Sequence, residues 1–239
     1  MKIGEGIKIG PGIRLTSVPS IVSTGLILDL DAKTYSGTGT TWPALTGSNA
    51  TLQNTPTYTA SAPTYFTFDK NAYEYATVPN LGNQLNWTLE CWFRVNSSLS
   101  GQITSIITNQ FDLVNKLNFS MGTNNAPSSY NLVIGFFDGA WHNTVGFAPN
   151  TNIWYHVIGT YDGTTIKQYL NSNLNSQLNY SGVPQSGGEV RIARRWDSSA
   201  TSSINYFPGD IGELRIYNTA LNESQVLRNY NATKARYGQ

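Results

Sequence analysis

The stretch Trp154-Tyr-His-Val157, with Thr160-Tyr-Asp-Gly163 and Tyr169-Leu-Asn171 after it, decides the fold. Aromatic and β-branched residues dominate both of its sides, and such residues favour extended strands. Asp162-Gly163 in the middle is a tight-turn signal, because glycine adopts positive φ without steric strain. The stretch therefore predicts two antiparallel strands, 154–161 and 165–170, joined by a short hairpin turn.

Short β signals separated by turn residues continue on both sides of this hairpin. The stretch Gly25-Leu-Ile-Leu-Asp-Leu-Asp31 alternates apolar and polar residues, as a half-buried strand does. The other predicted strands are 65–69, 73–78, 87–95, 105–108, 117–121, 130–137, 144–147, 189–193 and 213–217. So many short strands predict an all-β, two-sheet antiparallel sandwich.

A single short helix is expected near the end of the chain. Asn222 and Gln225 have the spacing of a capping box. We expect Val226, Leu227 and Tyr230 to form the buried face of this helix. Residues 25–239 contain no linker, so the sequence predicts one sandwich domain.

Composition excludes several classes of protein. Of 239 residues only 12% are charged, and 15 Lys and Arg balance 14 Asp and Glu. Nucleic-acid and membrane-surface binders need a basic excess, so neither partner is expected. The single Cys91 forms no intrachain disulfide and is expected to be buried and inert. The chain shows no signal peptide, which predicts synthesis in a cytoplasm without export by the general secretory route.

The first 24 residues form a separate segment. Lys2-Ile-Gly-Glu-Gly-Ile7 is repeated as Lys8-Ile-Gly-Pro-Gly-Ile13, and residues 16–24 are typical of a linker. In an extended chain the apolar residues share one face, and they are Ile3, Ile7, Ile9, Ile13 and Leu15. Three interpretations stay open: a frayed terminus, a strand added to the domain's own sheet, or an extended arm that adds strands to another chain.

Several motifs resemble the concanavalin A-like, laminin-G-like (LamG) family. The hairpin above is similar to that family's W-Y-H-V … T-Y-D-G … Y-x-N-G pattern. Trp87-Thr-Leu-Glu-Cys-Trp-Phe93 and Phe207-Pro-Gly-Asp-Ile-Gly-Glu-Leu-Arg-Ile-Tyr-Asn218 resemble two further family motifs. The resemblance implies a jelly-roll sandwich over residues 25–239. We expect Trp92, Trp154 and Tyr217 to point into the core between its sheets.

The acidic residues argue against an enzyme. Glucan-cutting enzymes of this fold carry three acids spaced E-x-D-x-E along one strand, and this chain has no such triplet. Its nearest match is the pair Asp29 and Asp31, which is more typical of a strand edge or turn. The sequence therefore predicts no catalytic residues.

Calcium is suggested by the resemblance alone, since many relatives bind one ion. Asp69, Asp210 and Glu213 are conceivable oxygen donors. Ala44 and Gly212, however, stand where the family usually has acids. No cofactor is required by the sequence, and no ligand set for calcium can be assigned.

Carbohydrate binding would use exposed aromatic rings as stacking platforms. Trp141 and Trp196 lie in predicted loops, and Arg194 and Arg195 precede Trp196. A loop tryptophan that covers the core or forms an oligomer contact is the alternative for either ring. The arginines could bind an acidic partner loop as well as a sugar.

The N-terminal repeat ahead of this sandwich resembles structural proteins of tailed bacteriophages. That resemblance implies a non-enzymatic virion protein, either tail-associated (a tail-fibre subunit) or a head-decoration subunit. Its arm would bind other virion chains, and its lectin-like module would be displayed at the surface, as a homo-oligomer such as a trimer. The alternative function is an adhesin for host-envelope glycans, with or without calcium.

Overall fold

The computed structural model describes residues 19–109, 117–123, 130–185, 188–196 and 202–239. The five apolar residues predicted to form one face of the arm, Ile3, Ile7, Ile9, Ile13 and Leu15, lie outside the described residues. None of the helices in the described ranges is long and apolar enough to cross a membrane.

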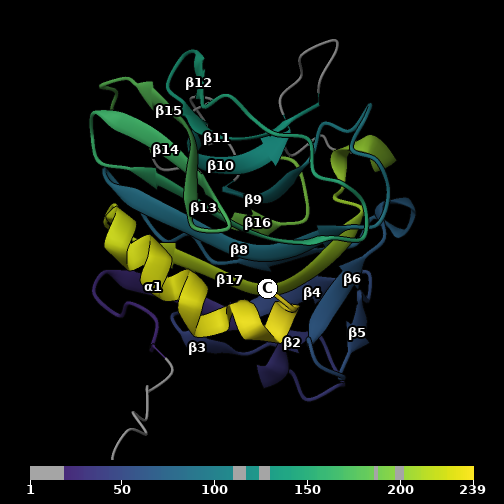
Figure 1. Ribbon diagram of the computed structural model, residues 1–239. Coiled ribbons are helices and arrows are strands. Elements are labelled where there is room, and N and C mark those ends of the chain that lie inside the picture. The colour runs from purple at the N-terminus through teal and green to yellow at the C-terminus, as the bar shows by residue number, and fades with distance from the viewer. Residues whose placement is uncertain (1–18, 110–116, 124–129, 186–187, 197–201) are drawn as a thin grey trace, which may run out of the picture.

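Two antiparallel sheets pack face to face, which confirms the predicted sandwich (Figure 1). Sheet A has the order β15-β14-β13-β8-β17-β1-β3, and β6 pairs with β17 and β5. Its strands are β1 (Leu26–Asp31), β3 (Ala44–Thr46), β5 (Thr57–Thr59), β6 (Tyr65–Phe68), β8 (Trp87–Val95), β13 (Trp154–Tyr161), β14 (Thr165–Leu170), β15 (Asn173–Asn179) and β17 (Gly209–Tyr217).

Sheet B has the order β12-β11-β10-β9-β16-β7-β4-β2. Its strands are β2 (Thr41–Trp42), β4 (Ala50–Gln53), β7 (Tyr75–Val78), β9 (Ser105–Asn109), β10 (Leu117–Thr123), β11 (Leu132–Phe137), β12 (Trp141–Asn143) and β16 (Val190–Ile192). The helical elements are η1 (Ala32–Thr34), η2 (Lys70–Ala72), η3 (Ser203–Asn205), α1 (Glu223–Thr233) and η4 (Lys234–Tyr237).

The predicted hairpin is present as β13 and β14, in register from Val157 opposite Leu170 to Tyr161 opposite Ile166. Gly163 has φ +94° in its turn, the conformation for which glycine is suited. The strand predicted at 144–147 is wrong, because Trp141–Asn143 already pair with β11 directly after the Asp138-Gly139 turn. Of the predicted strand only Phe147 makes an isolated bridge, to Leu132.

The core between the sheets is formed by alternate residues of both inner faces. On β8 these are Trp87, Leu89, Cys91 and Phe93, and Cys91 is buried as predicted. Trp92 points to the other face of sheet A, where it packs in a separate cluster with Trp154 and Tyr237. The expectation that Trp92, Trp154 and Tyr217 fill the core between the sheets is therefore wrong: all three are buried, but on the outer face of sheet A.

Helix α1 and η4 cover this outer face and lie along β8 and β17 (Figure 1). The Asn222 side chain accepts from the Gln225 N–H and the Gln225 side chain accepts from the Asn222 N–H, so the predicted capping box is present. Val226 is fully buried, as expected, whereas Leu227 is 48% exposed. The helical period explains the error, because the buried residues Val226, Asn229 and Thr233 follow at three- and four-residue spacing and leave Leu227 outside.

Residues 19–24, which the sequence analysis assigned to the linker, pack against α1. Val22 is buried in a cluster with Leu221 and Val226. The Val22 N–H donates to Asn229 Oδ1 at 2.8 Å, and Arg228 Nε donates to the Ser20 carbonyl at 2.6 Å. The chain therefore reaches the sandwich on the α1 side of sheet A.

Candidate functional site

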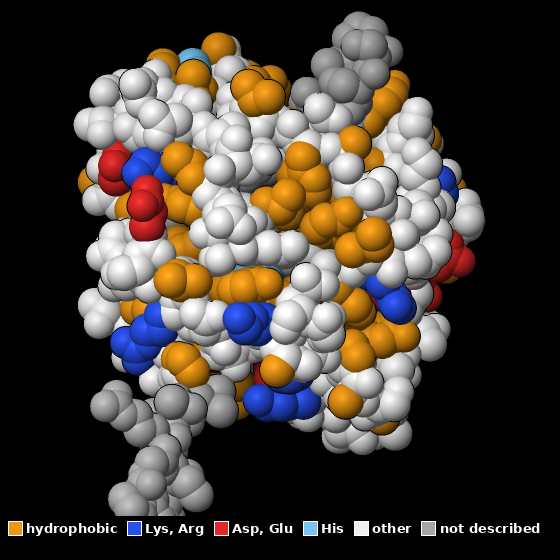
Figure 2. Space-filling view, viewed as in Figure 1, with side chains coloured by type: hydrophobic (Ala, Val, Ile, Leu, Met, Phe, Trp, Pro, Cys, Tyr) orange, Lys and Arg blue, Asp and Glu red, His pale blue; other side chains and the backbone are white. Residues whose placement is uncertain are grey.

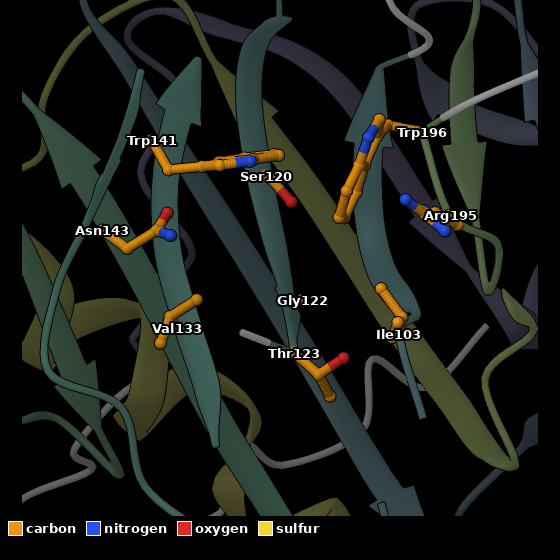
Figure 3. A pocket seen from close by; sticks show the side chains of 9 residues that line it. All are labelled: Ile103, Ser120, Gly122, Thr123, Val133, Trp141, Asn143, Arg195 and Trp196. Atoms are coloured by element: carbon orange, nitrogen blue, oxygen red, sulfur yellow. The ribbon is translucent and has the colours of Figure 1, made fainter. Parts of the chain in front are cut away.

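A groove of about 330 Å³ opens on the outward face of sheet B, the face that points away from sheet A. Its floor comes from β10, and its walls come from β11, β12 and the segment after β16 (Figure 3). The described lining residues include no Asp or Glu, and they are Ile103, Ser120, Gly122, Thr123, Val133, Trp141, Asn143, Arg195 and Trp196. We call this space the sheet B groove.

Two tryptophans predicted as stacking platforms meet in this groove. The ring centroids of Trp141 and Trp196 are 4.7 Å apart with an interplanar angle of 62°, so the rings form a corner (Figure 3). Trp141 is 38% exposed, whereas Trp196 is only 7% exposed. Trp141 therefore offers the more accessible ring, and Trp196 forms a fixed wall. Trp141 also lies on the edge strand β12 and not in a loop.

Arg191, on β16, holds the segment that carries Arg195 and Trp196 in place through hydrogen bonds to its backbone. The Arg191 Nη1 donates to the carbonyls of Arg195 and Trp196 at 3.3 and 3.2 Å. Its Nε forms an ion pair with Glu189 at 3.3 Å. The guanidinium of Arg195 in turn lies 4.8 Å from the Trp196 ring centroid. The wall of the groove is thus positioned by several contacts before any ligand binds.

The structure does not bring Arg194 into the groove with the other three predicted residues. Its guanidinium lies 4.6 Å from the Tyr75 ring centroid and 5.6 Å from that of Tyr206. Tyr75 and Tyr206, whose ring centroids are 5.9 Å apart, therefore form a second aromatic cluster around Arg194.

Sequence motifs did not reveal the polar residues of the groove, such as Ser120 and Asn143. The alternation of β10 contains a usable signal, since Phe119 and Met121 point into the core and place Ser120 and Gly122 on the opposite face. Asn143 is harder to predict, because its strand β12 is only three residues long.

A second polar cluster lies buried under α1 on the outer face of sheet A. Arg215 forms ion pairs with Asp29, Glu90 and Glu213, each within 3.0 Å. Arg236 reaches from η4 to Asp31 at 2.9 Å and also pairs with Glu213. Asp29 and Asp31 are therefore buried ion-pair partners, and Asp31 also ends β1 and caps the turn of η1 by accepting from the Lys33 N–H, as a strand-end or turn residue would.

The pKa values in this cluster follow from burial and pairing. Burial disfavours the charged form of Glu90, but Arg215 and a hydrogen bond from His156 outweigh burial and lower the pKa of Glu90 to about 2. Asp31 has a lowered pKa, because its bonds to Arg236 and Lys33 outweigh burial. Asp29 has a raised pKa, because burial outweighs its attraction to Arg215. Most of the cluster is thus ionised and internally paired.

Two of the three carboxylates considered for calcium are engaged in ion pairs, whereas the exposed Asp69 accepts from the Asn71 N–H at 2.8 Å. Asp210 accepts from Thr67 and Asn96 and pairs with Arg94, and Glu213 pairs with two arginines. Within the described ranges no three His, Cys, Asp or Glu side chains group so that they could hold a metal ion. Calcium binding stays a prediction of the sequence, without an assigned site.

The packing of Tyr237 explains why residue 212 is a glycine and not the acid that the family resemblance leads one to expect. A Cβ at this position would lie 2.3 Å from the Tyr237 hydroxyl oxygen. Tyr237 stacks on Trp92 at a centroid distance of 4.3 Å, so its ring occupies the space that a side chain at 212 would need. Packing of η4 therefore requires glycine here.

Solved structures of similar fold include carbohydrate-binding and toxin domains. Domain 4 of AbnA, a GH43 extracellular arabinanase from Geobacillus stearothermophilus, was solved in complex with arabinotriose. It matches with a TM-score of 0.64 and 18% identity over 86% of this chain and 98% of its own. The binding domain of botulinum neurotoxin DC in complex with SialylT matches with a TM-score of 0.62 and 13% identity, over 87% of this chain and 51% of its own.

Trypanosoma rangeli sialidase in complex with the inhibitor DANA matches with a TM-score of 0.62 and 14% identity over 91% of this chain. The chain spans only 34% of that sialidase, and all three likenesses show the fold alone. Among curated proteins, none matches this sequence.

A family model gives the more specific result. The model described as the concanavalin A-like lectin/glucanases superfamily matches residues 68–227, more than half of the chain. This range includes the hairpin 154–171, the lining residues of the sheet B groove and all of β17. Motifs, architecture and family model agree that the chain belongs to the concanavalin A-like lectin/glucanases superfamily.

Proposed function

We propose that this protein is a non-enzymatic carbohydrate-binding module whose binding site is the sheet B groove. The observation that carries the proposal is the tryptophan corner: Trp141 is 38% exposed and contacts the buried wall Trp196. Sugar rings have apolar C–H faces that stack on aromatic rings, and their hydroxyl groups need nearby hydrogen-bonding side chains. Asn143, Ser120 and Arg195 supply such groups beside the rings.

The size of the groove suits a small part of a glycan. Ligand sites typically enclose about 300–1,000 Å³, and this groove of about 330 Å³ lies at the lower end. We therefore expect one or two sugar rings in the groove itself. The remainder of a longer glycan would lie on the neighbouring surface.

A glycan array followed by calorimetry tests the proposal, with arabinotriose among the neutral probes. We expect the Trp141→Ala variant to bind the best array ligand at least about tenfold more weakly, since an aromatic anchor of this kind contributes a large share of binding energy. Trp196→Ala should weaken binding too, and it should also lower stability because Trp196 is buried.

Leu227→Ala is the matched control, because Leu227 is 48% exposed on α1, which covers the opposite sheet. It should bind glycan as the parent does. An array without any signal, or a Trp141→Ala variant of unchanged affinity, would contradict the proposed site. Adding calcium or a chelator to the same titrations tests the predicted calcium dependence.

The absence of catalysis belongs to this proposal. Its support is that Asp29, Glu90 and Glu213 are buried and that each is held in an ion pair with Arg215. Turnover of arabinan, sialosides or β-glucans above a blank would overturn it.

We further propose that the module is displayed on a virion, which deepens the same function. The support is the Gly/Ile repeat of residues 2–15 together with the position of residues 19–24 against α1. Ser20 and Val22 are bonded to α1 on the sheet A side, whereas the sheet B groove lies on the other side of the sandwich. An anchor on residues 1–15 would therefore leave the groove facing outward. The predicted homo-oligomer would be built by the same segment.

A further inference from the structure

Beside the sheet B groove, Arg194 forms a second cluster with three tyrosines. Its guanidinium stacks over Tyr75 and Tyr206 at 4.6 and 5.6 Å. Tyr73 meets Tyr206 edge-on at a centroid distance of 5.2 Å and is itself 40% exposed. The aromatic rings hold the guanidinium in one orientation and leave Tyr73 accessible to a ligand.

Arg194 has no acidic partner within the described part of the chain. Other arginines of the sandwich do: Arg94 pairs with Asp210, and Arg191 pairs with Glu189. Arg194 Nε is buried and makes no hydrogen bond with any described residue. A partly buried cation that no described carboxylate pairs with is unfavourable, and an anionic ligand would remove that cost.

The charges around Arg194 reinforce this view. Arg191 and Arg195 lie within three residues of it, and the described carboxylate in this segment is Glu189, which pairs with Arg191. Burial is the largest cause of the lowered pKa of Arg191, and the positive charge of Arg194 is the second largest. Among the described residues of this segment three arginines therefore stand against one carboxylate, although the whole chain carries a formal charge of only +1.

The tyrosine cluster and the sheet B groove are close enough for one ligand. Arg194 and Trp196 are separated by a single residue, so their Cα atoms are at most about 7 Å apart. Trp196 in turn contacts Trp141 in the groove. A glycan of a few sugar rings that stacks on Trp141 can extend across the Arg195–Trp196 segment to Arg194 and Tyr73.

Resting on the proposed function, we propose that the ligand is an acidic oligosaccharide whose anionic group binds Arg194. A neutral sugar of the same glycan occupies the sheet B groove, and a sugar ring stacks on Tyr73. A planar guanidinium donates two parallel hydrogen bonds to a carboxylate or to a sulfate, and both groups share this chemistry.

Matched glycans test this assignment on the full chain. The probes are lactose and N-acetyllactosamine, each in neutral, sialylated and sulfated form, and galactotriose against the galacturonic acid trisaccharide. We expect at least one acidic member to bind about tenfold or more tightly than its neutral counterpart, and the preference to fall with added salt. Tighter binding of the sialylated and galacturonic acid probes would identify a carboxylate as the anionic group, and tighter binding of the sulfated probes would identify a sulfate.

Two variants locate the preference. Arg194→Gln should reduce the affinity for the acidic glycan to that for the neutral one, while the neutral affinity stays unchanged. Tyr73→Asn removes the exposed ring but tolerates the left-handed backbone of this position (φ 58°), and it should weaken binding of the longer probes only. Lys167→Gln is the control: it removes one positive charge on β14 of sheet A, and it should preserve the acidic preference.

The outcomes separate this inference from the proposed function. Equal binding of neutral and acidic glycans, or an acidic preference that survives in Arg194→Gln, overturns the inference while glycan binding stands. If none of the probes and no array glycan binds, both proposals fall. A Tyr73→Asn variant that binds every probe as the parent does would exclude the tyrosine contact.

Discussion

At the residue scale, Glu90 is the centre of the buried polar cluster under α1. Its carboxylate accepts from Arg215 Nη1 at 3.0 Å and from Asn229 Nδ2 at 2.6 Å, and it contacts His156 Nε2 at 3.0 Å. Because all of these groups are buried, each would be costly without its partner. Glu90 therefore links β8, β13, β17 and α1 through one side chain.

The first prediction concerns the acid stability of this residue. Since the pKa of Glu90 falls from 4.5 to about 2 on folding, its contribution is complete above pH 4.5 and is lost as the pH falls towards 2. The loss should be on the order of 3 kcal/mol of unfolding free energy. Asp31 adds to this loss, whereas Asp29, whose pKa is raised, partly opposes it. Chemical denaturation at a series of pH values measures the effect.

Glu90→Gln checks the assignment to this side chain. It should destabilise the protein by about 3–5 kcal/mol at neutral pH, as breaking a buried ion pair does, and it should flatten the decline below pH 4.5. Glu223→Gln is the control, since its carboxylate is 70% exposed and lies 3.9 Å from Lys167. An unflattened pH profile in Glu90→Gln would show that other groups dominate acid unfolding.

At the scale of elements, α1 acts as the cover of sheet A. The capping box fixes where it begins, and Trp92 donates from Nε1 to Thr233 Oγ1 at 2.8 Å near its end. The helix therefore buries aromatic and ionic side chains that a two-layer sandwich would expose.

Removing the cap should loosen this cover. Asn222→Ala should lower the unfolding free energy by about 1 kcal/mol, because the Gln225 N–H loses its acceptor. Asn222→Ser keeps an acceptor and should lie within about 0.5 kcal/mol of the parent. Denaturant midpoints measure both losses, and a loss in Asn222→Ser as large as that in Asn222→Ala would show that the side-chain acceptor at position 222 does not stabilise the helix.

The sequence predicted elements better than faces, and β8 shows why. Its residues are buried on both sides, so alternation separates Cys91 from Trp92 without telling which faces the other sheet. Only the position of α1 and η4 decides that Trp92 lies outside the core between the sheets. Likewise, Trp141 and Trp196 could be named as candidates, but their contact depends on strand pairings that no local pattern contains.

At the scale of the whole molecule, the two faces of the sandwich differ. Sheet A is closed by α1 and by residues 19–24, whereas the outward face of sheet B carries the groove. Charged side chains are sparse on the face shown in Figure 2, which is mostly white and orange, in line with the 12% charged composition. The described lining of the groove contains one charged side chain, Arg195, so recognition within the groove itself would rest mainly on stacking and hydrogen bonds.

Deleting residues 1–15 tests the predicted arm at this scale. Because the deletion stops short of Ser20 and Val22, which contact α1, we expect a folded, soluble sandwich with an unchanged melting temperature and unchanged glycan binding. Assembly into oligomers or particles should be lost, as light scattering would show. A drop in melting temperature comparable to a core defect would mean that the segment is an ordinary strand of its own domain.

The contact between Trp92 and the end of α1 has a consequence during translation. Trp92 and Thr233 are 141 residues apart in the chain, so at ribosomal rates the indole is synthesised roughly 7 to 28 s before its partner. For that interval the residues on the outer side of β8, Trp92 among them, lack the cover of α1 and expose apolar surface on the nascent polypeptide. Chaperones that recognise aromatic segments would bind this surface during the interval. Folding of the domain would be completed only after the last turn of α1 has left the exit tunnel.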